Sequence, residues 1–164
     1  MEFDKIDLPE LVVFDLDFTL WDCGGTWCDC LSPPFSGEGG RVYDAYGRHV
    51  QLYSDVLGIL DELDSLEIPM ALASRTERPD WARQLLDRLG IRERFEYEEI
   101  FPSRKIKHLE NIRRSSGVEL ENMLFFDDEM RNLHDLRPLG VKCVFVPDGM
   151  SDQLFRGGFE LFRE

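Results

Sequence analysis

The segment Leu11–Leu20, LVVFDLDFTL, constrains the fold of this chain more than any other stretch. A short apolar run rich in branched and aromatic residues leads into Asp15, and Asp17 follows. Such a run is typical of a strand buried on both faces of a parallel sheet. Open α/β sheets bind ligands at the carboxyl ends of their strands, so both carboxylates are expected at that edge. Because buried carboxylates are costly without a compensating cation, we expect the rest of the chain to supply one.

Strands and helices alternate along the rest of the chain. Further buried strands are predicted at Ile68–Ala73, Glu98–Phe101, Met123–Phe126 and Val141–Val146. Helices are predicted from Asp55 to Leu66 with Ser54 as cap, from Pro79 to Leu89 before Gly90, from a Ser103 cap to Arg114 before Gly117, from Glu129 to Leu136, and after Ser151. This alternation predicts an α/β fold, a three-layer, doubly wound (Rossmann-like) parallel sheet of about five strands.

The chain is predicted to form a single domain over residues 1–164, beginning with a loose arm over residues 1–10. Residues 21–53 are an irregular insertion, rich in Gly, Cys and Pro, and would form only a minimal cap. Within the insertion, Arg41–Leu52 alternates loosely around Gly47, which predicts a small β-hairpin.

Charge and composition exclude several classes of function. Lys plus Arg number 19 against 33 Asp plus Glu, and the formal net charge of −14 argues against generic binding of nucleic acid or anionic membranes. The acidic N-terminus does not resemble a targeting peptide, and no apolar run is long enough for a membrane helix. We therefore expect a cytoplasmic protein, and a monomer.

Polar residues follow several predicted strands and should converge on one crevice. They are Asp15, Asp17, Ser74, Lys105, Asp127 and Asp128. Lys107 competes with Lys105, but the two point about 200° apart on a helix, so only one faces the crevice, and we favour Lys105 because it lies nearer the helix start. Carboxylates, a hydroxyl and a lysine suit phosphoryl transfer, and a small set of oxygen ligands suits Mg2+.

These motifs resemble those of the haloacid dehalogenase superfamily, and most closely those of its magnesium-dependent phosphatase family. The first motif is Asp15–Leu20, the second contains Ser74, the third Lys105, and the fourth is Asp127–Asp128. The segments ASRT, FFDDE and DGM extend the resemblance over most of the chain beyond Leu11. The resemblance implies a magnesium-dependent phosphatase that works through a phosphoaspartate.

The resemblance also implies a role for each matched residue. Asp15 would be the nucleophile and a metal ligand, and Asp17 the general acid and base, with its backbone carbonyl on magnesium. Lys105 would stabilise charge on the nucleophile and the phosphate. Asp128 would complete the metal shell with Asp127 close by, and the sequence leaves open which of them ligates directly. Substrate binding is assigned to Leu16, Ser74, Arg75, Trp21 and Lys105.

Several residues near these motifs fit more than one position in the predicted fold. Arg131 and Asn132 fit an exposed helix face as well as a supporting role behind the site. Trp21 and Trp27 either frame the mouth of the pocket or pack under the hairpin. His108 and His134 have no evident partner, so surface or helix-face positions are expected for both.

The insertion is unusually rich in cysteine. Cys23, Cys28 and Cys30, with His49, suggest a zinc site, but their spacing is not a standard pair of CxxC hooks. Free thiols are therefore favoured, and Cys143 is expected in the core. The family usually has proline after the tryptophan, whereas Asp22 follows Trp21 here. Because this insertion would border the mouth of the pocket, the resemblance predicts substrate choice less well than it predicts the chemistry.

We expect a magnesium-dependent phosphatase that hydrolyses phosphate monoesters. The resemblance implies phosphotyrosine and phosphorylated sugar–amine adducts of proteins as substrates. The partner would be a phosphorylated small molecule or protein side chain. A small-metabolite (sugar phosphate) phosphatase or phosphomutase is the alternative. A non-catalytic binding domain on the same fold is less favoured, because every matched position is occupied.

Overall fold

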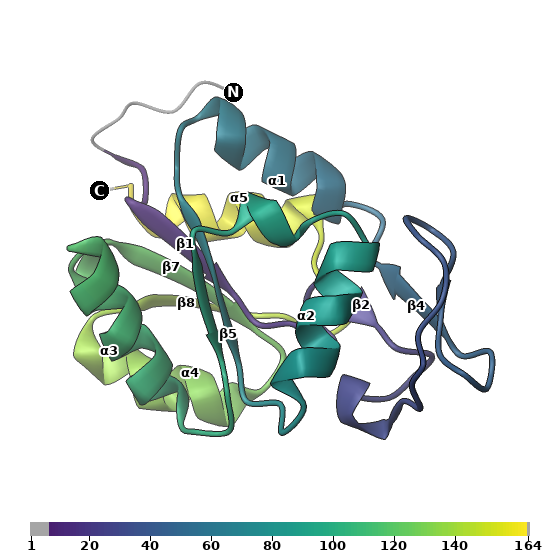
Figure 1. Cartoon of the computed structure of the whole chain (residues 1–164). Coiled ribbons are helices and arrows are strands. Elements are labelled where there is room, and N and C mark those ends of the chain that lie inside the picture. Colours follow the sequence, from purple (N-terminus) through teal and green to yellow (C-terminus); the bar gives the residue numbers. More distant parts are fainter. Residues whose placement is uncertain (1–6, 164) are drawn as a thin grey trace.

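The computed structural model describes residues 7–163 and forms two sheets over that range (Figure 1). The larger sheet is parallel, with strand order β6-β5-β1-β7-β8. Its strands are β1 (Leu11–Phe14), β5 (Met70–Ser74), β6 (Tyr97–Ile100), β7 (Met123–Asp127) and β8 (Lys142–Phe145). In the central strand, Val13 lies opposite Ala71 of β5 and Phe125 of β7. The predicted parallel sheet is confirmed, with strand ends shifted by at most two residues.

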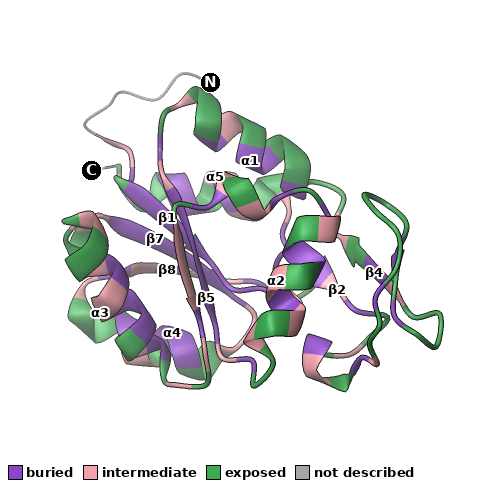
Figure 2. Cartoon of the chain, in the orientation of Figure 1, coloured by how far each residue is buried: buried purple, intermediate pink, exposed green. Residues whose placement is uncertain are grey.

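Alternate side chains of the sheet pack into two separate cores. The helices are α1 (Val56–Ser65), α2 (Pro79–Arg88), α3 (Lys105–Ser116), α4 (Met130–Leu136) and α5 (Asp152–Glu160). Val12 and Phe14 face the core formed with α1, α2 and α5, whereas Leu11 and Val13 face α3 and α4. Figure 1 shows α1 beside α5, with α3 and α4 across the sheet, and Figure 2 shows β1 and β7 buried between them. This is the predicted three-layer, doubly wound arrangement.

The helix ends agree only partly with the predicted caps. Ser151 caps α5, where its hydroxyl accepts a hydrogen bond at 3.2 Å from a first-turn amide. Gly117, at φ +76°, ends α3 as predicted. The predicted caps Ser54 and Ser103 are wrong, because each helix starts one residue later and has no side-chain cap bond. None of the helices in residues 7–163 is long and apolar enough to cross a membrane.

The segment between β1 and α1 stands at the carboxyl end of the central strand. It contains β2 (Trp21–Asp22), the 3-10 turn η2 (Cys28–Cys30), β3 (Val42–Tyr43) and β4 (His49–Leu52). β4 pairs antiparallel with both β2 and β3, and Gly47 at φ +81° lies in the turn between β3 and β4. The predicted hairpin is therefore confirmed. The segment lies next to α2 (Figure 1), where η2 contacts the helix. Of the predicted N-terminal arm, residues 1–6 lie outside the described residues.

Candidate active site

The carboxyl ends of the parallel strands open into a cavity of about 670 Å³. Its walls are formed by residues after β1, β5, β6 and β7, together with the η2 turn. The lining includes Asp15, Asp17, Ser74, Arg75, Lys105 and Asp128, all of which the sequence placed at the site. Leu16 is different, because the whole residue is buried and it does not line the cavity.

Lys105 forms the centre of a buried charge cluster. Lys105 is the first residue of α3 and is 1% exposed. Its Nζ lies 2.9 Å from Asp15 Oδ1 and 3.1 Å from Asp127 Oδ2. The same ammonium also donates to the carbonyl of Ala73. Burial alone would lower the pKa of Lys105, but the two carboxylates outweigh it and raise that pKa. The competing Lys107 is exposed on the outer face of α3.

Asp15 is held from two sides at the cavity floor. Besides Lys105, the hydroxyl of Thr19 donates to Asp15 Oδ2 at 3.3 Å. Burial raises the pKa of Asp15 well above its ordinary value, Asp127 raises it further, and Lys105 acts in the opposite direction. A cation bound beside Asp15 would favour its ionised form.

The two acidic residues after β7 differ in their surroundings. Asp127 is completely buried, and its carboxylate accepts hydrogen bonds from the Glu129 amide at 2.8 Å and the Asn132 side chain at 3.0 Å. Asp128 lines the cavity, and burial together with the charge of Asp127 raises its pKa to about 6. One oxygen from each of Asp15, Asp127 and Asp128 lies within 4.8 Å of the others. This set of hard oxygen donors fits Mg2+.

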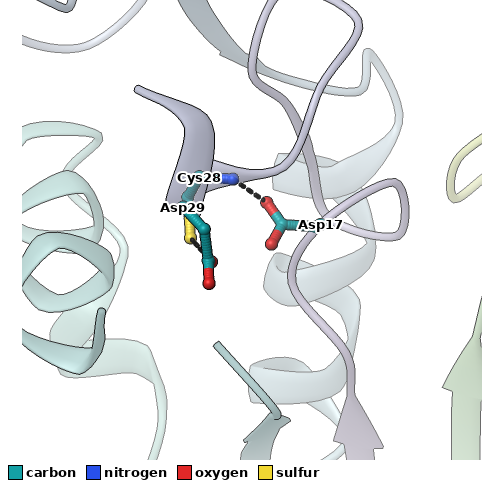
Figure 3. A group of neighbouring side chains, drawn as sticks. All are labelled: Asp17, Cys28 and Asp29. Carbon is teal, nitrogen blue, oxygen red and sulfur yellow. Dashed lines mark hydrogen bonds between the residues drawn. The ribbon is translucent and has the colours of Figure 1, made fainter. Parts of the chain in front are cut away.

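Asp17 is oriented by donors behind it. Its Oδ1 accepts from the Trp21 indole at 2.7 Å, the Cys28 amide at 2.9 Å and the Cys23 thiol at 3.7 Å (Figure 3 shows the Cys28 contact). Burial raises the pKa of Asp17, and the bonds from Trp21 and Cys28 partly offset this. Trp21 was expected against substrate, but it is completely buried and does not line the cavity. Its indole instead fixes the orientation of Asp17.

Asp29 ties the η2 turn to the loop after β5. Its carboxylate accepts a hydrogen bond from the Thr76 hydroxyl and another from the Glu77 amide at 3.0 Å. Asp29 also lies beside Asp17 and Cys28, as Figure 3 shows, within a second group of potential ligand atoms. Burial strongly raises the pKa of the Cys28 thiol, which disfavours its thiolate form.

The suggested zinc ligands do not come together in the structure. Cys23 and Cys28 are buried, whereas Cys30 is exposed. His49 stacks on Tyr43, and its Nε2 lies 2.8 Å from the carbonyl of Gly40. Within residues 7–163, the three thiols and His49 do not form a group with metal-ligand spacing. All four cysteines are free thiols, as favoured from the sequence.

Asn132 links two sides of the site and is not an exposed helix residue. It is 2% exposed, and its side chain accepts from Arg75 Nη1 at 3.2 Å while donating to Asp127. This contact turns Arg75 along the cavity wall next to Ser74, whose side chain is also buried. The neighbouring Arg131 is exposed and pairs with Glu129 at 2.6 Å.

His108 was expected on a helix face but is completely buried under the loop before α3. Its Nε2 lies 2.8 Å from the Phe101 carbonyl, and the two rings are 4.3 Å apart between centroids. Burial lowers the pKa of His108 to about 4, so the ring is neutral and packs as part of the core. His134 is exposed, as expected.

Known proteins resemble this chain in sequence and in fold. The acid phosphatase family profile matches residues 7–164. Magnesium-dependent phosphatase 1 of Homo sapiens is 42% identical over 157 residues, covering 94% of this chain and 88% of that protein. A HAD-like hydrolase superfamily protein of Schizosaccharomyces pombe is 37% identical over 150 residues, covering 84% and 85%. A HAD-superfamily hydrolase structure from Ehrlichia chaffeensis matches with a TM-score of 0.65 at 15% identity, covering 94% of this chain and 96% of that chain.

The doubly wound sheet and the acidic cavity at its strand ends are those of a haloacid dehalogenase superfamily phosphatase. Within that superfamily, the chain belongs to the acid phosphatase family. It is a phosphomonoesterase, and its human relative is a magnesium-dependent phosphatase.

Proposed function

We propose that this phosphatase transfers the phosphoryl group of its substrate to Asp15 and then to water. The observation that carries the proposal is the position of Asp15, a buried carboxylate at the cavity floor, fixed by Lys105 and Thr19. An oxygen of Asp15 attacks phosphorus, the ester P–O bond breaks, and Asp17 gives its proton to the leaving oxygen. Asp17 then takes a proton from water, whose oxygen bonds to phosphorus as the bond to Asp15 breaks. Inorganic phosphate leaves, and both side chains are restored.

Asp17 is suited to exchange this proton. Three donors converge on its Oδ1, which fixes the carboxyl plane and leaves Oδ2 as the oxygen for proton transfer. Burial raises its pKa, which favours the protonated form that the first step needs.

Asp15 and Asp128 would hold Mg2+, with the backbone carbonyl of Asp17 as a third ligand. Asp127 already accepts from Lys105, Asn132 and a backbone amide, so its role is to position Lys105. When bound, the metal neutralises charge on the phosphoryl oxygens. Ser74, Arg75 and Lys105 would face the same oxygens with fixed donors.

The volume of the cavity supports a bulky substrate. At about 670 Å³ it far exceeds the space for a phosphoryl group, and residues 21–53 contribute one wall of it. We treat this segment as an insertion in a single domain, and the enzyme as a monomer. A phosphorylated protein side chain fits such a site, with phosphotyrosine or a phosphorylated sugar–amine adduct as the proposed substrate.

Hydrolysis of p-nitrophenyl phosphate, with and without Mg2+, tests the chemistry. The Asp15→Asn variant should lose turnover, while Asp80→Asn, at a residue whose side chain is 93% exposed, should match the wild type. Full activity of Asp15→Asn would refute the assignment of the nucleophile. A panel of sugar phosphates beside a phosphotyrosine peptide then tests the substrate, since selective turnover of one small metabolite would favour a metabolite phosphatase.

A further inference from the structure

Trp27 is a large aromatic side chain that the chemistry above does not use. It precedes the η2 turn, lines the cavity and is 53% exposed. The indole of Trp27 packs against the ring of Phe18 in an edge-to-face contact, with 5.8 Å between the ring centroids and an interplanar angle of 88°. Among the described residues that line the cavity, Trp27 alone is aromatic. An indole therefore stands half open to solvent on an otherwise largely polar wall.

The position of Asp17 shows which part of a substrate Trp27 faces. A general acid must reach the oxygen of the leaving group, so the wall next to Asp17 is the leaving-group side. Trp27 is on that wall, because the amide of the next residue, Cys28, donates to Asp17 at 2.9 Å. Ser74, the last residue of β5, and Lys105, the first residue of α3, come from other elements, and the proposed function assigns them to the phosphoryl oxygens.

The turn that carries Trp27 is fixed in place. Asp29, two residues on, accepts hydrogen bonds from Thr76 and from the Glu77 amide after β5. The carbonyl of Trp27 accepts from the Cys30 amide at 3.0 Å, which closes the turn. An indole carried by a fixed main chain and supported by Phe18 loses little conformational entropy when a ligand packs against it.

We infer that Trp27 determines specificity by packing against a flat ring in the leaving group. This inference rests on the proposed function, because it uses Asp17 as the general acid. An aryl ester places a ring beside its ester oxygen, where the indole can stack on it, whereas a short alkyl ester offers no such surface. The enzyme therefore selects phosphate esters whose leaving group carries an aromatic ring.

The test compares kcat/KM for p-nitrophenyl phosphate and glycerol 2-phosphate in wild type and variants. Trp27→Ala should lower the aryl-to-alkyl ratio by about tenfold, the size expected for a lost aromatic contact. Trp27→Phe keeps a ring and should recover most of the ratio. Tyr46→Ala is the matched control, because Tyr46 lies on the same segment, is 84% exposed and does not line the cavity. Its ratio should equal that of the wild type.

Failure of the inference can be told apart from failure of the proposed function. An aryl-to-alkyl ratio that does not change in Trp27→Ala, in an enzyme whose turnover requires Asp15, overturns the inference alone. Turnover that persists in Asp15→Asn overturns the proposed mechanism. Circular dichroism of each variant confirms that the comparison is made between folded proteins.

Discussion

Replacing Lys105 with methionine should strongly destabilise the protein. Methionine nearly fills the space of the lysine stem, so the main change is the loss of one buried charge. Asp15 Oδ1 and Asp127 Oδ2, at 2.9 and 3.1 Å from Nζ, would then face each other without a cation. Removing one partner of a buried ion pair costs about 3–5 kcal/mol. For a domain of this size, that corresponds to a fall in Tm of roughly 6–20 °C.

The loss should depend on pH and on metal. The pKa of Asp15 is already raised by burial, and removing Lys105 would raise it further. A folded-state pKa above the unfolded value means that the destabilisation is smallest at acid pH and grows as pH rises towards the folded-state pKa. Mg2+ should restore part of the stability, because it would supply positive charge beside Asp15.

Urea unfolding in EDTA and in Mg2+, from acid to neutral pH, measures these effects. Lys107→Met is the control, because Lys107 lies on the same helix but is exposed, and it should change stability by less than about 0.5 kcal/mol. If Lys105→Met lowered the free energy of unfolding by less than about 1 kcal/mol at neutral pH in EDTA, this result would refute the argument. The two buried carboxylates would then be stable without the charge of the lysine.

Two further predictions concern packing and metal binding. Gly158→Ala should destabilise the protein by about 1 kcal/mol, because the new Cβ would lie 2.9 Å from the buried ring of Phe126. Gly157→Ala, whose Cβ would have no atom within 4 Å, should stabilise the protein by about 0.5–1 kcal/mol. Thermal unfolding compares the two variants, and equal effects would contradict this packing. The affinity for Mg2+, measured by calorimetry, should weaken as pH falls below about 6, because Asp128 takes up a proton there. An affinity that does not change over that pH range would argue against Asp128 as a ligand.

The sheet and the strand-end residues were predictable because both depend on local patterns. The apolar run before Asp15 is a signal contained within a few residues, and parallel strands bring their carboxyl ends to one edge whatever the loops do. Helix geometry predicted that only one of Lys105 and Lys107 could face the crevice, and Lys105 was favoured because it lies nearer the helix start. Gly117 likewise marked the end of that helix through its left-handed backbone.

What the sequence did not show depends on contacts between distant segments. Asp29 bonds to Thr76, 47 residues away, and Asn132 bonds to Arg75, 57 residues away. No periodicity records such pairs, because each residue taken alone fits an exposed turn or helix face. Trp21 was misplaced for the same reason, since only the folded chain shows that its indole binds Asp17 from behind. The one local signal available for Asn132 was its position on the inner face of a short helix.

Trapping the phosphorylated enzyme tests the central claim most directly. The Asp17→Asn variant, mixed with p-nitrophenyl phosphate and Mg2+, should still form the intermediate, because p-nitrophenolate leaves without a proton from a general acid. It should then lack the base that activates water. After rapid acid quenching, peptide mass spectrometry should place one phosphoryl group on Asp15, and none should be found when Asp15→Asn is added to the variant. A phosphoryl group on another residue, or p-nitrophenol release from Asp17→Asn with an enzyme that never carries phosphate, would contradict the account.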